Sequence, residues 1–165
     1  MVVISNTTPL NYLILIGLVD VLPVLYVEIS IPEAVFAELQ RDKTPQPVRE
    51  WIVNRPEWLF VKQVQTEDLS LERLHAGERE AILLAKQIKA DALIIDERDG
   101  RRAAQRLGIR VIGTMRVLAD AAEAGLCNLE DALDRLQQTS FRLSSRLKKA
   151  ILDAHIWDKE QSDRQ

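Results

Sequence analysis

Carboxylates are the side chains of this sequence whose types and spacing could do chemistry. The chain has 165 residues, with 25 Asp and Glu, but its only histidines are His75 and His155 and its only cysteine is Cys127. This inventory excludes a closed Cys/His zinc site, and neither histidine has a recognisable setting for a Ser-His-Asp triad. The sequence has no GxxxxGK[ST] or GxGxxG loop to bind phosphate. The carboxylates remain, either as acid/base pairs or as ligands of a hard metal such as Mg²⁺.

Two apolar runs end in polar residues that could take part in such a site. Residues 1–5 predict a strand, which is followed by Asn6, and residues 92–96 predict a strand that is buried on both faces and ends in Asp96, with Asp99 three residues on. In a parallel sheet the carboxyl ends of the strands share one edge, where ligands are usually bound. Asn6 and Asp96 therefore converge there if their strands are neighbours.

Two glutamates lie on predicted helices connected to this sheet. Glu38 is late in the helix that follows a predicted strand at residues 27–31, and Glu78 begins a helix after Gly77, which we interpret as a break between two helices. A crossover helix runs antiparallel to the strand that it feeds, so Glu78 starts on the same edge as Asp96.

The elements that must position these residues alternate between strand and helix. Thr8 and Pro9 predict a helix cap and a first-turn proline, and Thr114 predicts the cap of a later helix. The pattern predicts an α/β fold, a three-layer α/β/α sandwich with a central parallel sheet and extra C-terminal helices. We expect a single domain over residues 1–155, with its core at 1–125, C-terminal helices at 128–156 and a frayed tail at 157–165. The apolar stripes of the C-terminal helices are expected to pack on the parent domain, or secondarily to form a dimer or partner surface.

Composition limits the partners and the compartment. The net charge of −3 gives no global attraction to nucleic acid, so a polyanion would need a local basic patch. The apolar stretch near residues 10–25 is interrupted by polar residues, glycine and proline, so we expect no membrane span. The first residues do not have the pattern of a signal peptide. One cysteine gives no disulfide framework within the chain, which favours a reducing cytoplasm.

Five ordered motifs resemble a known family. They are SNTTPL, IPEAVFAEL, GEREAILLA, LIIDERDGRRAA and GIRVIGT. In this order and at these spacings they resemble the PIN domain, and in particular a prokaryotic subgroup with GExEA and DExxGR motifs that is often associated with VapC-type toxins. The resemblance implies an α/β/α sandwich and a nuclease, usually acting on RNA, whose acidic residues hold one or two Mg²⁺ or Mn²⁺ ions. It also implies a homodimer and, for a toxin, a small antitoxin protein that covers the acidic cleft.

The resemblance assigns catalytic and metal-binding roles to individual residues. The four acids of the family correspond to Asn6, Glu38, Glu78 and Asp96. Asp99 is an additional metal ligand or a residue that hydrogen-bonds to the ligands. Of the two glutamates near the start of the helix, the family pattern assigns Glu78 to the site, and not Glu80. Asn6 departs from the family, where aspartate is more common. Its carbonyl oxygen still suits a hard cation, but it adds no charge. The alternative for Asn6 is a plain Asx turn or a helix cap.

Substrate binding is assigned to residues next to these acids. The basic residues are Arg98, Arg101, Arg102 and Arg106, at helical spacing after Asp96, and they could position phosphates. The alternatives are a solvated helix surface or, for Arg101, a pair with Glu97. Thr7 and Thr8 could orient the first ligand or contact phosphate.

Two functions of different class follow. The first is a metal-dependent ribonuclease, the toxin of a toxin-antitoxin pair. The second is a PIN-fold binding or regulatory module with weakened or lost catalysis, which Asn6 favours. Clustered like charges favour the first, because an abandoned site has no physical reason to keep them.

Overall fold

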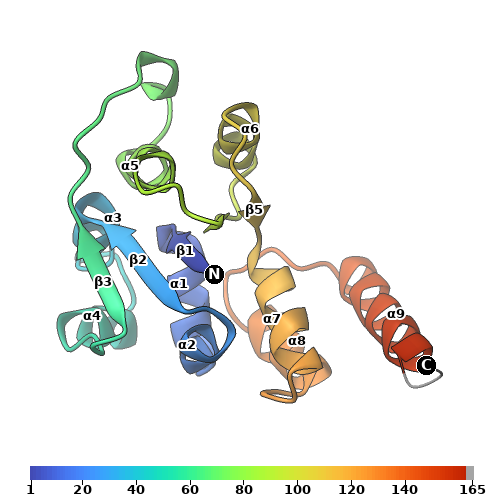
Figure 1. Cartoon of the computed structure of the whole chain (residues 1–165). Coiled ribbons are helices and arrows are strands. Elements are labelled where there is room, and N and C mark those ends of the chain that lie inside the picture. Colours follow the sequence, from blue (N-terminus) through green and yellow to red (C-terminus); the bar gives the residue numbers. More distant parts are fainter. Residues whose placement is uncertain (163–165) are drawn as a thin grey trace. The chain divides into compact units, whose positions relative to one another are not determined.

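The central element of the structure is a parallel sheet. The structure is a computed structural model that describes the backbone of residues 1–162 and the side chains of residues 1–159. Within the described residues five strands pair in the order β3-β2-β1-β4-β5 (Figure 1). The strands are β1 (Val2–Ser5), β2 (Glu28–Pro32), β3 (Leu59–Lys62), β4 (Ala92–Ile94) and β5 (Val111–Ile112). All pairings are parallel, as the sequence predicts.

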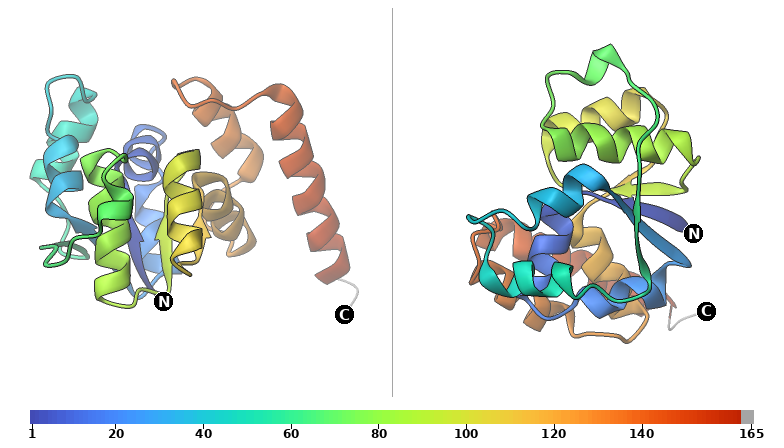
Figure 2. Two further views of the ribbon diagram at one scale, coloured as in Figure 1. Left: turned by 90° about the horizontal axis from the view of Figure 1, so that it is seen from above. Right: turned by 90° about the vertical axis from the view of Figure 1, so that its left-hand side faces the viewer.

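Helices cover both faces of this sheet. Those of the first 113 residues are α1 (Thr7–Leu15), η1 (Val19–Val21), α2 (Leu22–Leu25), α3 (Glu33–Glu38), α4 (Gln46–Val53), η2 (Leu69–Leu71), α5 (Ala76–Gln87) and α6 (Arg98–Arg106). Figure 2 (right) shows α5 and α6 on one side of the sheet and α1, α2 and α4 on the other. The predicted three-layer α/β/α sandwich is therefore confirmed.

The core explains why the apolar runs form the central strands. Val3, Ile4, Leu93 and Ile94 are fully buried, and Ile4 and Leu93 belong to one apolar cluster with the inner face of α5. Strands covered on both faces need apolar residues at successive positions, because alternate side chains point to opposite faces.

Two local predictions differ from the structure. Asn6, and not Thr8, is the N-cap of α1, which begins at Thr7, because the Thr8 hydroxyl donates to Glu97 on another element. Gly77 does not separate two helices, because α5 begins before it, at Ala76. The first backbone N–H groups of a helix have no partner within the helix, so the N–H of Gly77 is available to a side chain.

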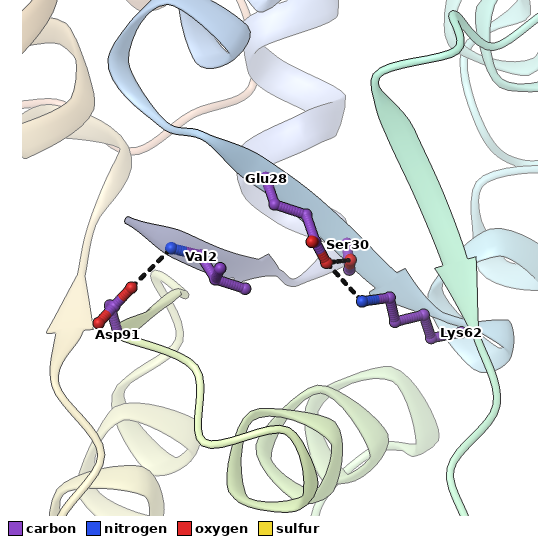
Figure 3. Close-up of polar contacts among 5 residues, drawn as sticks. All are labelled: Val2, Glu28, Ser30, Lys62 and Asp91. Carbon is purple, nitrogen blue, oxygen red and sulfur yellow. Dashed lines mark hydrogen bonds and ion pairs between the residues drawn. The ribbon is translucent and has the colours of Figure 1, made fainter.

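Polar contacts also link the strands of the sheet to their neighbours. The backbone N–H of Val2 donates to Asp91 Oδ2 at 2.6 Å, just before β4 (Figure 3). Glu28 on β2 accepts from Ser30, and its carboxylate forms an ion pair with Lys62 on β3. The Lys62 ammonium lowers the pKa of Glu28 below its usual value.

The chain divides into two compact units after Thr114, and the second unit is helical where it is described. It contains most of α7 (Thr114–Glu123), then α8 (Leu129–Gln137) and α9 (Ser145–Ser162). The apolar stripe of α8 is buried, whereas Leu147 and Ile156 on α9 are about half exposed, at 47% and 55%. Helix α9 continues through residues 157–162, where the sequence predicted a frayed tail; residues 163–165 lie outside the described part.

Among the described residues, no single helix is long and apolar enough to cross a membrane. Helix α1 and the segment Val19–Leu25 reach that length and composition only together, and they are bent by 115°.

Candidate metal and nucleic-acid site

The candidate site lies at the carboxyl edge of the sheet, where β1 ends. Ser5 pairs with Ile94 on β4, and the backbone N–H of Asn6 continues the ladder by donating to the Ile94 carbonyl at 2.9 Å. Asn6 is 2% exposed. The strands that carry Asn6 and Asp96 are therefore neighbours, which is the condition on which their predicted convergence depended.

Glu38, at the end of α3, is held by two hydrogen bonds. Its Oε2 accepts from the hydroxyl of Thr7 at 2.5 Å, and its Oε1 accepts from the backbone N–H of Gly77 at 2.9 Å. A Cβ at position 77 would lie only 2.4 Å from Glu38 Oε2. Glycine is therefore required for this close approach between α5 and the Glu38 carboxylate.

Asn6 and Thr8 both bind Glu97, the residue after Asp96. The Asn6 Nδ2–H donates to Glu97 Oε2 at 3.0 Å, and the Thr8 hydroxyl donates to Glu97 Oε1. The other side-chain oxygen of Asn6, Oδ1, is buried and has no hydrogen-bond partner. Thr7 and Thr8 therefore orient Glu38 and Glu97, and not Asn6 as one of the predictions had it.

Sequence reasoning missed Glu97 as a member of this site and considered it only as a partner of Arg101. The family pattern drew attention to Asp96, the acid that ends the apolar run. The sequence did offer a signal for Glu97, since it is a second carboxylate directly after that run. Consecutive residues at the end of a strand point in different directions, so either of the two acids could face the site.

Glu78 lies in the first turn of α5 and contributes to the cap of that helix. Its Oε2 accepts from the backbone N–H of His75 at 3.2 Å, in a capping box. Burial raises the pKa of Glu78, and the neighbouring charges of Glu97 and Asp99 raise it further. Its other oxygen, Oε1, lies close to Gly100 in the first turn of α6. A Cβ added to Gly100 would lie 3.5 Å from this oxygen.

Glu80, two residues further along α5, has a different environment. Its carboxylate accepts from the backbone N–H of Ala34 in the first turn of α3, at 3.0 Å. This contact satisfies a free helix N–H group, so Glu80 has a structural role.

Asp96 is bound to Thr114, at the start of α7. The backbone N–H of Thr114 donates to Asp96 Oδ1 at 2.8 Å, and the Thr114 hydroxyl donates to Oδ2 at 2.6 Å. Burial is the main cause that raises the pKa of Asp96, and the charge of Glu97 raises it further. The two hydrogen bonds from Thr114 and the charge of Arg101 lower this pKa, but by less. Both oxygens of this carboxylate are thus already hydrogen-bonded.

The arginines of α6 do not form one face. Arg98, Arg102 and Arg106 are exposed, one turn apart along the helix, whereas Arg101 is half-buried and its Nη1 donates to the Ile95 carbonyl at 2.8 Å. Arg101 therefore has a structural contact, although with Ile95 and not with the carboxylate of Glu97 as the alternative reading had it.

The predicted residues thus meet at one edge but in separate hydrogen-bonded groups. Glu38 is with Thr7, Asn6 is with Glu97 and Thr8, and Asp96 is with Thr114. In the part of the chain that the structure describes, no three His, Cys, Asp or Glu side chains stand close enough to hold a metal ion together.

The donor atoms nevertheless fit a hard divalent cation. They are amide and carboxylate oxygens, which Mg²⁺ and Mn²⁺ prefer. The buried, unpartnered Oδ1 of Asn6 is an acceptor that lacks a donor or a cation, and such groups are rare in folded proteins. The charge of Glu97 raises the pKa of both Glu78 and Asp96, so negative charge is in excess at this edge.

Comparisons with known proteins agree with this fold. The family model described as a PIN domain (DUF3368) matches residues 2–156. Among solved structures, the chain resembles a PilT N-terminus domain protein from the hyperthermophilic archaeon Sulfolobus solfataricus P2, with a TM-score of 0.54 and 17% identity, over 74% of this chain and 95% of that one. A likeness at that identity shows the fold alone. No curated protein matches the sequence significantly. Because the family model covers nearly the whole chain, the protein belongs to the PIN domain family.

Proposed function

We propose that this protein is a Mg²⁺- or Mn²⁺-dependent endoribonuclease. PIN domains are in general metal-dependent nucleases. The observation that carries the proposal for this chain is the buried Oδ1 of Asn6, which has no hydrogen-bond partner, on a side chain whose Nδ2–H donates to the Glu97 carboxylate at the carboxyl edge of the sheet. A buried acceptor beside excess negative charge is best satisfied by a cation.

The metal would be held among Asn6, Glu38, Glu78 and the acids that follow β4, which are Asp96, Glu97 and Asp99. The chemistry that a bound divalent metal supplies is acidification of water and stabilisation of charge on a phosphodiester. Thr7 and the Gly77 N–H hold the Glu38 carboxylate in one orientation, and Thr8 does the same for Glu97. Ligands held by such second contacts lose less freedom when the cation binds.

The exposed arginines of α6 support a nucleic-acid substrate. Arg98 and Arg102 extend from the helix that begins directly after Asp96 and Glu97, so positive charge lies next to the acidic edge. Contacts to phosphate position a nucleic acid without reading its sequence. This stripe would therefore bind the RNA backbone, whereas Arg101, bound to Ile95, would not contact the substrate.

The biological role is part of the same proposal and rests on the resemblance of the motifs. In this proposal the protein is the toxin of a toxin-antitoxin pair, a homodimer that acts in the cytoplasm and is inhibited by a small antitoxin protein. Its single cysteine is consistent with a reducing compartment.

Metal binding and cleavage together test the function. We expect Mn²⁺ at millimolar concentration to raise the Tm. Where the metal is at 100 times its Kd, the free energy of unfolding should rise by about 2.7 kcal/mol. RNA cleavage should require Mn²⁺ or Mg²⁺ and should be lost in Glu78→Gln, which keeps the capping box because glutamine also serves at that position. Glu130→Gln is the matched control, since Glu130 is an exposed first-turn acid on α8.

The second candidate is a PIN-fold binding module, and the amide at position 6 is the observation that favours it. One carboxylate fewer weakens the attraction for a divalent cation. A folded protein that Mn²⁺ does not stabilise, and that does not cleave RNA, would refute the nuclease in favour of this second candidate.

A further inference from the structure

We infer that the segment leading into the last helix carries a further contact for RNA, separate from the acidic edge of the sheet. The contact is a set of four exposed polar side chains, which we call the α9 patch, and it binds the phosphate backbone. Its residues are Arg142, Ser144, Ser145 and Arg146. The inference rests on the proposed ribonuclease function and adds to it a binding surface on the second compact unit.

Charge is distributed unevenly along this chain. The protein as a whole has a net charge of −3, so it has no general attraction for a polyanion. Residues 135–152 nevertheless contain five Lys and Arg and no Asp or Glu. Such a concentration of positive charge is the local basic patch that an acidic protein needs in order to bind RNA.

The ion pairs of this segment leave two of its arginines unpaired. Lys148 and Lys149 form ion pairs with aspartates of α8 and α9. In the part of the chain that the structure describes, the guanidinium groups of Arg142 and Arg146 form no hydrogen bond or ion pair. An exposed guanidinium without a protein partner is available to a phosphate group, whose oxygens match its planar set of N–H donors.

The side chains between these two arginines also fit phosphate. Ser144 and Ser145 are exposed, whereas Leu143 is buried and fixes the segment to its unit. The Ser144 hydroxyl accepts from the backbone N–H of Leu147 at 3.1 Å, which positions this hydroxyl and leaves its own hydrogen available to donate.

A surface made of such donors favours a nucleic acid over an acidic protein. Arginine and serine are common donors to phosphate oxygens, and these contacts need no apolar centre. A protein interface, by contrast, usually depends on a buried aromatic or arginine anchor in a packed pocket. The substrate of the proposed function is itself a polyanion, so the charge of the α9 patch is complementary to it.

The α9 patch contributes to affinity and not to hydrolysis. It contains no carboxylate that could hold a metal, and contacts to phosphate position a nucleic acid without reading its sequence. We therefore expect loss of the patch to raise the KM for RNA cleavage and to leave kcat unchanged.

Binding of a short, fluorescently labelled oligouridine RNA in EDTA tests the inference without relying on activity. The test variant is R142Q/R146Q. The matched control R41Q/K43Q removes the same charge from two exposed residues that flank Asp42. Circular dichroism confirms that each variant is folded.

The salt dependence of binding gives the expected size of the effect. Each phosphate contact to a single strand contributes about 0.7 to the slope of log Kd against log salt concentration, so the loss of two contacts should lower this slope by about 1.4. Between about 50 and about 200 mM salt, the native chain should therefore lose about sevenfold more affinity than R142Q/R146Q. The control should keep the native slope.

Three results would overturn the inference. One is a native chain that does not bind the RNA, or a test variant that keeps the native affinity and slope. Another is an equal loss in the control, because the effect would then come from total charge. The third is a test variant that loses binding to polyglutamate and not to RNA, since the partner would then be an acidic protein.

The proposed function is decided separately, by metal-dependent cleavage. A chain that cleaves RNA equally well with and without the two arginines, at the same KM, keeps the function and refutes the role of the α9 patch. A chain that shows no metal-dependent cleavage, but whose RNA binding depends on Arg142 and Arg146, refutes the ribonuclease and keeps the patch as an RNA-binding surface.

Discussion

Replacing Gly77 by alanine tests whether the Glu38 carboxylate depends on its close approach to α5. The new Cβ would lie 2.4 Å from Glu38 Oε2 and 2.8 Å from Oε1. Ordinary contact begins near 3.5 Å, so the carboxylate must move by about 1 Å. That movement would break its hydrogen bonds with the Gly77 N–H and the Thr7 hydroxyl.

The size of the effect follows from these two bonds. A hydrogen bond to a charged group contributes about 1.5–3 kcal/mol when it is buried, and about 1 kcal/mol is more appropriate for the half-buried Glu38. Alanine stabilises a helix by about 0.5–1 kcal/mol relative to glycine. Gly77→Ala should therefore lose about 1 kcal/mol net, which lowers the Tm by about 2–4 °C in a chain of this length.

The assay is thermal unfolding in EDTA, repeated in a Glu38→Ala background. Without the Glu38 side chain the clash is absent, so Gly77→Ala should then raise the Tm slightly. The coupling between the two substitutions should be about 2 kcal/mol. If Gly77→Ala shifts the Tm equally in both backgrounds, the glycine does not serve Glu38 and the reasoning is wrong.

Three further outcomes are expected. Thr114→Val should cost about 1–3 kcal/mol in thermal unfolding, because it leaves Asp96 Oδ2 without its hydroxyl donor, whereas Thr114→Ser keeps the donor and should be close to the native chain. Lys62→Met should lower stability by less than about 1 kcal/mol at pH 7, since Lys62 lowers the pKa of Glu28. A lowered pKa stabilises the fold above the unfolded value of 4.5, so urea unfolding should show the difference vanishing as the pH falls through the folded pKa; a difference that persists at low pH would contradict this ion pair. Burial raises the pKa of the Cys127 thiol, so its reaction with a disulfide reagent at pH 8 should be much slower in the native protein than in urea, and equal rates would contradict its burial.

Much of the fold is predictable because the signals that specify it are local. The apolar run that forms β4 must be buried on both faces, and the alternation of strands and helices leaves a parallel sheet as the simple solution. The same logic brings Asn6 to the edge shared with Asp96, since β1 and β4 pair directly.

Cap positions were harder to predict, because they depend on competing contacts. Thr8 has the side chain of a helix cap, but its hydroxyl is bound to Glu97, and α1 begins one residue earlier. The type of residue 77 suggests a helix break, but Gly77 lies in the first turn of α5. A glycine fits there because the Glu38 carboxylate occupies the space that a Cβ would need.

Apolar periodicity and composition are properties of short segments, so they are enough to predict the sheet, its helices and the acidic character of one edge. Which acid meets which partner depends on tertiary contacts. Asp96 and Glu97 are adjacent and chemically alike, yet one binds Thr114 and the other binds Asn6. The direction of each side chain depends on how the chain turns from β4 into α6 and on what lies across the sheet edge, and neither is encoded in the spacing of residues along the chain.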